Sequence, residues 1–374
     1  MPAISGVPAT ATLAASPLLD RLRETVPALA VDADTWARRM MRWHFSEETG
    51  SPFWLRRRAA LGFDPLRDVA GLADLDRFGL FDKQALRTAP AADLVPRGFA
   101  HRPRRIFETG GTTGRPCRVA DVTTGEINVR IYRAMLELRG LAGGDALAMT
   151  PSGPHAYGAF VARLADSWAG NTLAVDFDPR WVKRLLRAGQ PVEPYVEHLI
   201  EQTVELLELH RPRLLFTTSK LLLELAPALP RPLAAYGVRG VCTGGTSCTA
   251  EETRYLEENH LQGVQWIDTY GNTLMGHALQ GDPWAGCARR AYYLPPPLGF
   301  IRLVDAADWR QPVAMGERGR VLLVTLLEDL FLPNLLERDS AVRTGPHPWF
   351  PWEGVRDVQP YAAAGEAAAT EGVY

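Results

Sequence analysis

The chain has 374 residues, of which 46% are hydrophobic and 22% charged, and its formal net charge is −2 at pH 7. This length and composition provide for a large buried core and predict one large α/β domain or two closely joined ones. The near-balanced charge excludes a general affinity for nucleic acid or an anionic membrane, so small molecules are the expected ligands. Without a long apolar run or a leader-like N-terminus, we expect a cytoplasmic protein.

The first elements in chain order are a disordered segment and a helix. Residues 1–16 are rich in Ala, Pro, Ser and Thr, and we expect them to be disordered. A helical element is predicted over 35–61, before Gly62 and Pro65 end it. Its aromatic and methionine side chains fall close to helical spacing and are most simply core residues. They are Trp36, Met40, Trp43 and Phe45.

Residues 109–119 contain the most informative pattern of the chain, T-G-G-T-T-G-R-P-C-R-V. This glycine-rich stretch lies between two β-branched runs and predicts a strand-loop-strand hairpin. Glycines allow backbone N–H groups to approach an anion closely, the threonine hydroxyls add donors, and Arg115 adds charge. These features indicate a phosphate-binding loop, although neither the P-loop nor the dinucleotide pattern is present. The alternative is an ordinary glycine turn.

An alternation of helices and strands follows. Helices packed on both faces of a mostly parallel sheet are the architecture that such an alternation predicts. A capping box is predicted at Thr249 and Glu252, where a new helix begins, and a β-rich segment is predicted from residue 299 onward. The predicted helices are 124–138, 195–210 and one from residue 220, and the predicted strands are 146–150, 171–177 and 214–217.

The loop T-G-G-T-T-G-R-P resembles that of the adenylate-forming superfamily, in its phenylacetate–CoA ligase-like branch. Members use ATP to activate carboxylates, and short forms similar to this chain occur in phenazine-type antibiotic biosynthesis. The resemblance covers residues 35–357. It implies an α/β fold: a large N-terminal domain of mixed, mostly parallel sheets flanked by helices, a smaller β-rich subdomain, and no C-terminal mobile domain, which carries the adenylation lysine in relatives. The expected divisions are 1–16, 17–298, 299–357 and a low-complexity tail at 358–374.

The resemblance also implies roles for particular residues. Thr112, Thr113 and Arg115 are the expected catalytic residues of the loop. ATP is expected to contact the rest of the loop, the segments G-G-T and Y-G-N-T, a ribose-binding aspartate and an arginine near the end of the resemblance. These residues are Thr109, Gly110, Gly111, Gly114, Gly244, Gly245, Thr246, Tyr270, Gly271, Thr273, Asp339 and Arg356. His155 and Tyr157 are expected to line the carboxylate pocket, although a lone histidine is often structural.

Two positions depart from the family pattern. Thr246 stands where glutamate is commonest, and Leu274 stands where relatives place a magnesium-binding glutamate. The second departure puts Mg²⁺-assisted adenylation in doubt, because Mg²⁺ neutralises the charge that develops as pyrophosphate leaves. Asp268 is a conceivable substitute. Some relatives carry zinc, but the spacing of Cys242, Cys248, His277 and Cys287 matches no known ligand pattern, so we expect no zinc site.

Two functional hypotheses therefore stand side by side. In the first, the chain adenylates an aryl or related carboxylate with ATP and passes the acyl group to CoA, an amine or a partner protein. In the second, a degenerate member binds a nucleotide or aromatic metabolite as a carrier or scaffold without adenylating it. Dimers are common in this branch, so the resemblance also allows a homodimer.

Overall fold

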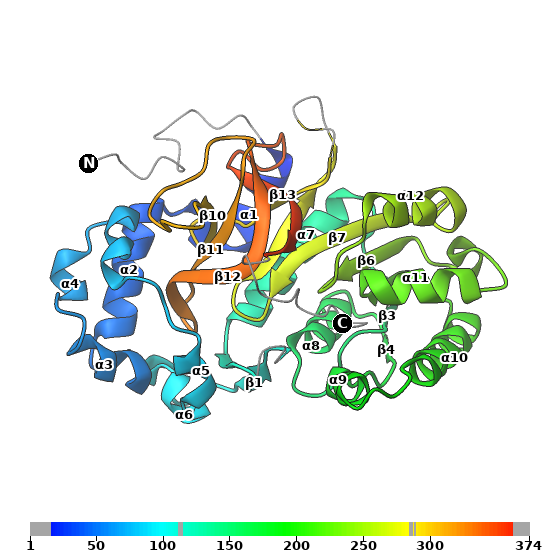
Figure 1. Cartoon of the computed structure of the whole chain (residues 1–374), viewed down its shortest axis with the longest axis horizontal. Coiled ribbons are helices and arrows are strands. Elements are labelled where there is room, and N and C mark those ends of the chain that lie inside the picture. Colours follow the sequence, from blue (N-terminus) through cyan, green and yellow to red (C-terminus); the bar gives the residue numbers. More distant parts are fainter. Residues whose placement is uncertain (1–15, 111–114, 284–286, 288, 362–374) are drawn as a thin grey trace. The chain divides into compact units, whose positions relative to one another are not determined.

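The structure is a computed structural model that describes residues 16–110, 115–283, 287 and 289–361. The chain forms two compact units, whose elements are labelled in Figure 1. The first unit takes its described residues from Met1–Ala134 and Asn272–Ala369, and the second takes its described residues from Met135–Gly271. No helix within these described ranges is long and apolar enough to cross a membrane.

The second unit is built on a parallel sheet. Its strands are β3 (Ala146–Ala148), β4 (Thr172–Ala174), β5 (Leu214–Thr217), β6 (Gly240–Gly244) and β7 (Gln265–Asn272). They run side by side in the order β7-β6-β5-β3-β4. Strands β3, β5 and β6 are buried at every position, which is typical of a parallel sheet covered on both faces.

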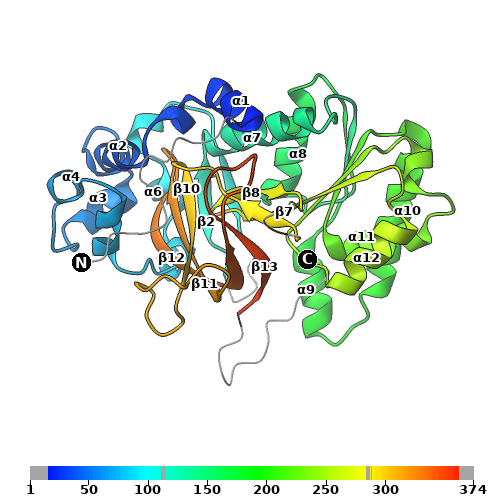
Figure 2. The same cartoon turned by 90° about the horizontal axis from the view of Figure 1, so that it is seen from above.

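Helices cover both faces of this sheet. They are α8 (Ala156–Asp166), α9 (Pro179–Arg187), α10 (Glu193–His210), α11 (Ser219–Ala228), the 3-10 helix η4 (Leu233–Tyr236) and α12 (Ala250–Asn259). Helix α7 (Thr124–Leu138) begins in the first unit and ends in the second. Helices α10, α11 and α12 lie together on one side of the strands in Figure 2, and their core includes Leu215 and Val241. On the other face, Phe160 meets Phe216 with ring centroids 6.3 Å apart. The predicted sheet flanked by helices is confirmed.

The first unit carries an antiparallel sheet, which confirms the predicted β-rich segment. Its strands are β8 (Gly276–Gly281), β9 (Ala291–Tyr293), β10 (Gly299–Val304), β11 (Arg318–Leu326), β12 (Phe331–Thr344) and β13 (Gly354–Pro360), in the order β10-β11-β12-β13-β9-β8. Strand β12 passes through Pro333, which has no N–H group for the ladder. Asn334 has a φ of +49°, and the pairing with β11 shifts register there. The strand therefore continues past the proline by bulging.

Short helices make up the N-terminal part of the first unit. They are α1 (Pro17–Thr25), α2 (Ala33–Phe45), α3 (Pro52–Arg58), α4 (Pro65–Asp68), α5 (Gln84–Thr88) and α6 (Ala91–Leu94), with 3-10 helices η1 (Pro27–Ala30), η2 (Leu72–Phe78) and η3 (Arg97–Phe99). Helix α2 is anchored through its ring nitrogens. The indole N–H of Trp36 donates to the backbone oxygen of residue 326 at 2.8 Å. The imidazole of His44 donates to that of residue 327 at 2.7 Å, and the indole N–H of Trp43 donates to that of residue 328 at 2.6 Å. These bonds fasten α2 to the turn after β11.

The prediction of one helical element over 35–61 is wrong, because α2 ends at Phe45 and α3 begins at Pro52. Proline has no N–H group and its ring blocks a helix from continuing through it. Gly50 approaches the backbone oxygen of His44 so closely that a Cβ atom would lie 2.4 Å from it. Ser51 then caps α3 by accepting a hydrogen bond from a backbone N–H at 3.3 Å. The break therefore follows from the sequence Gly-Ser-Pro.

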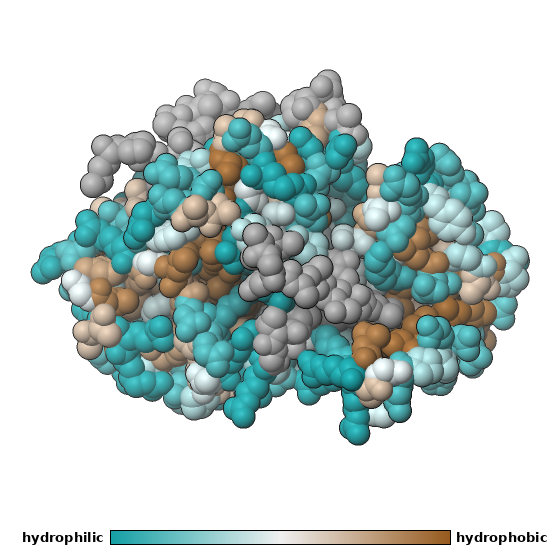
Figure 3. Space-filling model, in the orientation of Figure 1, coloured by the Kyte–Doolittle hydropathy of each residue, from teal (hydrophilic) through white to brown (hydrophobic). Residues whose placement is uncertain are grey.

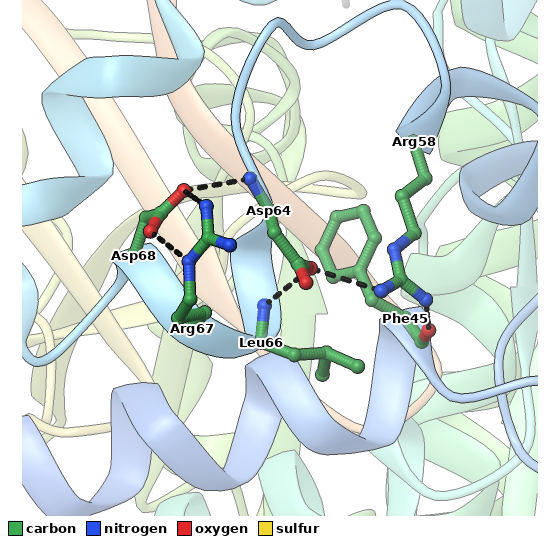
Figure 4. Close-up of polar contacts among 6 residues, drawn as sticks. All are labelled: Phe45, Arg58, Asp64, Leu66, Arg67 and Asp68. Atoms are coloured by element: carbon green, nitrogen blue, oxygen red, sulfur yellow. Dashed lines mark hydrogen bonds and ion pairs between the residues drawn. The ribbon is translucent and has the colours of Figure 1, made fainter.

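Figure 4 shows the contacts that hold α4. Asp64 caps its first turn by accepting from a backbone N–H at 3.2 Å, and it also pairs with Arg58 of α3 at 2.9 Å. Arg58 in turn donates to the backbone oxygen of Phe45 at 3.0 Å, where α2 ends. Arg67 and Asp68 pair at 2.8 Å, and this hydrogen-bonded guanidinium lowers the pKa of Asp68 to about 2. Arg58 and Asp64 thus join α2, α3 and α4, while the Arg67–Asp68 pair lies within α4.

Candidate functional site

The glycine-rich segment connects two paired strands of the first unit, β1 (Arg105–Glu108) and β2 (Arg118–Asp121). Thr109 and Cys117 close this hairpin. The N–H of Thr109 donates to the oxygen of Cys117 at 3.0 Å, and the N–H of Cys117 donates to Thr109 Oγ1 at 3.0 Å. The predicted strand-loop-strand hairpin is confirmed.

The described ends of the glycine-rich loop are accessible to a ligand. Gly110 is half-buried and Arg115 is exposed. A guanidinium presents several fixed donors and pairs well with phosphate oxygens, so Arg115 has the charge and exposure that its predicted role requires. Four predicted phosphate contacts fall outside the described residues, and their role stays a prediction. They are Gly111, Thr112, Thr113 and Gly114.

Three predicted adenine contacts lie where β6 ends in the second unit. Gly244 is the last residue of the strand, and Gly245 has a φ of +86°, which glycine adopts without strain. A Cβ atom on Gly244 would lie 3.3 Å from the backbone oxygen of Thr269, so glycine keeps β6 close to β7. Thr246 Oγ1 accepts from the N–H of Lys220 at 3.2 Å. The carboxyl ends of parallel strands are where open α/β sheets bind ligands.

Helix α12 begins directly after this segment, and its predicted capping box is confirmed. Thr249 Oγ1 accepts from the N–H of Glu252 at 3.1 Å, while a carboxylate oxygen of Glu252 accepts from the N–H of Thr249 at 2.8 Å. Glu252 also pairs with Lys220 of α11 at 2.8 Å. These contacts fix the start of α12 relative to α11 and so hold the turn that carries Thr246.

The two predicted pocket residues lie at the beginning of α8. His155 is 4% exposed and occupies the N-cap position of the helix. The hydroxyl group of Tyr157 lies 3.2 Å from the backbone oxygens of both Thr217 and Cys242. A hydroxyl has one hydrogen, which these two carbonyl groups share. A Cβ atom on Gly244 would lie 3.8 Å from the same hydroxyl, so the structure brings Tyr157 next to a predicted adenine contact.

Strand β7 carries the predicted aromatic contact. Tyr270 and Gly271 are half-buried near its carboxyl end. Asp268, two positions before Tyr270, accepts a hydrogen bond from Thr243 Oγ1 at 2.5 Å. Thr243 Oγ1 itself accepts from the indole N–H of Trp266 at 2.8 Å. Asp268 is therefore held within the sheet. The second unit gathers seven predicted residues along the carboxyl ends of its strands: His155, Tyr157, Gly244, Gly245, Thr246, Tyr270 and Gly271.

Leu274 is buried in the first unit. The residue is 1% exposed and follows the predicted contact Thr273. Its N–H donates to Asn272 Oδ1 at 2.8 Å, and its backbone oxygen accepts from Thr325 Oγ1 at 2.8 Å. The position where relatives place a magnesium-binding glutamate is thus occupied by an apolar core side chain.

The predicted ribose and phosphate residues lie on paired strands of the first unit. Asp339 is on β12 and Arg356 is on β13, and the ladder pairs Asp339 with Pro360 and Val342 with Arg356. Arg356 forms an ion pair with Asp357, whose φ of +52° is unusual for a residue other than glycine. Asp339 and Arg356 therefore lie on neighbouring strands, a few residues apart along the ladder.

The cysteines and histidines considered as metal ligands do not form a metal site among the described residues. The described residues contain no group of three or more His, Cys, Asp or Glu side chains that could hold a metal ion. Burial, together with the nearby carboxylate of Glu252, raises the pKa of Cys248 to about 12. Its thiol is therefore protonated at neutral pH, whereas zinc binds the thiolate.

One polar cluster in the first unit was not predicted from the sequence. Lys83 forms an ion pair with Glu337, 254 positions later, and Asn272 Nδ2 donates to Glu337 Oε1 at 3.3 Å. Glu337 is 5% exposed. The sequence leads us to expect Lys83 to be a structural residue, and Asn272 lies within the Y-G-N-T segment. A pair so distant along the chain leaves no local pattern.

No protein-family profile matches the chain, and no curated protein matches it. Solved structures do match. An open conformation of 2-hydroxyisobutyryl-CoA ligase in complex with 2-HIB-AMP and CoA has a TM-score of 0.62 and 17% identity, over 89% of this chain and 75% of that one. The same ligase in the postadenylation state with 2-HIB-AMP has a TM-score of 0.63 and 15% identity, over 92% of this chain and 67% of that one. ATP-bound MatB from Rhodopseudomonas palustris has 15% identity over 68% and 47% of the two chains, and its TM-score of 0.47 is too low to support an assignment.

The chain has the fold of 2-hydroxyisobutyryl-CoA ligase. The fold that the glycine-rich loop predicted is thereby confirmed. Similarity at 15–17% identity is a similarity of fold alone. Because one fold can carry different reactions, the reaction has to be inferred from the residues of the site.

Proposed function

We propose that this chain is an adenylate-forming ligase, which binds ATP and activates a carboxylate as its acyl-adenylate. The observation that carries the proposal is the T-G-G-T-T-G-R-P hairpin in a chain of this fold. The sequence motif and the structural similarity both support the same type of ligase. Crystal structures of 2-hydroxyisobutyryl-CoA ligase contain 2-HIB-AMP, an acyl-AMP, and this is the type of product that the proposed reaction forms.

The proposed reaction needs positioning and charge neutralisation. A carboxylate oxygen attacks the α-phosphorus of ATP, the bond to the bridging oxygen breaks, and pyrophosphate leaves with the bonding electrons. No proton moves, so donors aimed at the phosphates are the main requirement. In our proposal, Thr112, Thr113 and Arg115 supply such donors, Tyr270 stacks on the adenine, and Asp339 accepts hydrogen bonds from the ribose hydroxyls.

The finer proposal concerns the acid and the acceptor. We propose an aryl or related carboxylate bound beside His155 and Tyr157, and CoA, an amine or a partner protein as the acceptor, in a phenazine-like biosynthetic setting. Support comes from the resemblance to the phenylacetate–CoA ligase-like branch. Tyr157 is half-buried, and its hydroxyl is hydrogen-bonded to two carbonyl groups, so its position beside the end of β6 is fixed.

A protein that binds a nucleotide or aromatic metabolite without adenylating is the second candidate. The buried Leu274 favours it, because this side chain cannot hold Mg²⁺. Pyrophosphate release from ATP, Mg²⁺ and a panel of aryl and aliphatic acids separates the two, with ATP binding followed by calorimetry. Release with any acid supports the ligase. Binding without release supports the second candidate, and no binding refutes both.

A further inference from the structure

The ion pair between Lys83 and Glu337 is largely buried in the first unit. Lys83 precedes α5 and its side chain is 27% exposed, while Glu337 lies on β12 and its side chain is 7% exposed. A carboxylate removed from water is strongly destabilising unless a cation and hydrogen-bond donors surround it. The two side chains are therefore held in one geometry, unlike the partners of a solvent-exposed surface ion pair.

An amide fixes the orientation of this pair. Asn272 Nδ2 donates to Glu337 Oε1 at 3.3 Å, and Asn272 Oδ1 accepts from the N–H of Leu274 at 2.8 Å. Because both ends of the amide are engaged, its orientation is determined. Glu337 is thereby bound to the Y-G-N-T-L segment, which carries the predicted aromatic contact.

Two other predicted nucleotide elements lie beside Lys83. Its backbone oxygen is 3.8 Å from Cys117 Sγ, and Cys117 closes the glycine-rich hairpin through Thr109. Glu337 stands two positions before Asp339 on β12, within the stretch where the pairing of β12 with β11 shifts register. Lys83 thus contacts the glycine-rich hairpin through its backbone, and its ammonium group is linked through Glu337 to β12 and to Asn272.

The residues present do not fit the magnesium site of the family. Mg²⁺ rests on one or two carboxylates plus phosphate oxygens, whereas Leu274 is buried and apolar. The carboxylate of Glu337 is already bonded to Lys83 and Asn272. Within the described part of the chain, Glu337 is the only partner of the Lys83 ammonium, so two of its three hydrogens are available to a ligand.

We propose that Lys83, positioned by Glu337, contacts the phosphates of ATP and supplies the positive charge that a carboxylate-bound Mg²⁺ supplies in the family. This inference rests on the proposed function. As pyrophosphate leaves the α-phosphorus with the bonding electrons, an ammonium hydrogen-bonded to its oxygens stabilises the developing charge and keeps its own proton. Glu337 is a positioning residue, because it acts on the phosphates only through Lys83.

Calorimetric titration of ATP and AMP tests the proposal without relying on turnover. Loss of one charge-assisted contact weakens binding about 10- to 100-fold. We expect that loss for ATP in Lys83→Gln, an AMP affinity that is nearly unchanged, and substantial recovery in Lys83→Arg, which keeps the charge. We also expect removal of Mg²⁺ to weaken ATP binding by the wild-type protein less than Lys83→Gln does.

Two further variants keep the test decisive. Lys83→Gln leaves Glu337 buried without a counterion, which destabilises the fold, so Lys83→Gln/Glu337→Gln removes both charges together. Arg302→Gln is the matched control, because it breaks a comparably buried pair with Asp76, at 2.8 Å, elsewhere in the first unit. The control should bind ATP like the wild-type protein.

The outcomes separate this inference from the proposed function. An unchanged ATP affinity in the folded double variant overturns the inference, and so does an equal loss for ATP and AMP. A loss specific to ATP without pyrophosphate release from any acid supports the role of Lys83 and refutes adenylation. Release that is the same in the wild-type protein and the double variant, at equal ATP affinity, supports adenylation and refutes the role of Lys83.

Discussion

Replacing Leu274 with glutamate places a carboxylate at a position that is 1% exposed. The substitution removes about 2 kcal/mol of apolar burial. Burial also raises the pKa of a carboxyl group by about 3 units or more, and each unit corresponds to about 1.4 kcal/mol, so the ionised form adds about 4 kcal/mol. The sum of about 6 kcal/mol is comparable to the whole stability of many domains, about 5–15 kcal/mol.

The pH dependence identifies the cause of this loss. The folded-state pKa of the new carboxyl is raised above its unfolded value of about 4.3. The ionisation penalty is therefore absent below about pH 4, grows as the pH rises from the unfolded to the folded pKa, and is constant above the folded pKa. Urea unfolding at pH 5 and pH 8 measures it, and the deficit of Leu274→Glu relative to wild type should be larger at pH 8.

Two neutral substitutions serve as controls for this experiment. Leu274→Gln has a similar shape and no ionisable group, so its deficit should be the same at both pH values. Leu274→Met conserves volume and should lose less than about 1.5 kcal/mol. A Leu274→Glu protein as stable as wild type at pH 8 would refute the burial of this side chain and return the position to the list of magnesium ligands.

Three more predictions concern other parts of the chain. Burial lowers the pKa of His44 to about 4. As the pH falls, the unfolded chain therefore binds a proton at this imidazole before the folded chain does, and the free energy of unfolding should fall by up to about 3 kcal/mol between pH 6.5 and pH 4. A fall of equal size in His44→Gln would contradict this. Tyr270→Ala should weaken ATP binding by about 1–3 kcal/mol and leave tripolyphosphate unaffected, and equal calorimetric losses would instead indicate a core residue. Asp64→Ala removes the α4 cap shown in Figure 4 and should lower unfolding stability by about 1 kcal/mol, whereas Asp64→Asn, which keeps a capping oxygen, should lose less.

Local patterns were read correctly where neighbouring residues determine the structure. The helix at 124–138 was predicted with the bounds of α7, because its apolar residues repeat at helical spacing, and the Thr249 capping box depends on residues three positions apart. The prediction misses the break between α2 and α3, although the run S-E-E-T-G-S-P at 46–52 interrupts the apolar spacing.

Contacts between distant residues were beyond the reach of sequence patterns. The bulge at Pro333 and Asn334 depends on how β12 pairs with β11, and proline alone argues against a strand. The Lys83–Glu337 pair depends on a fold that joins positions far apart. In the candidate site, the motifs predict which segments contact ATP, whereas the hydrogen-bond partner of each side chain is known only from the structure.

The divided origin of the first unit has a consequence during synthesis. Trp36 of α2 donates to the backbone oxygen of Leu326, 290 positions later. At about 5–20 residues per second, the ribosome makes the acceptor roughly 15–60 s after the donor. The described residues of the second unit belong to one continuous segment. This unit can therefore complete its sheet while the apolar face of α2 is still exposed, because the partner of α2 has not yet been synthesised. A nascent chain of this protein therefore exposes a tryptophan-bearing amphipathic helix for much of its own synthesis, and that helix is the segment that we expect a chaperone to bind.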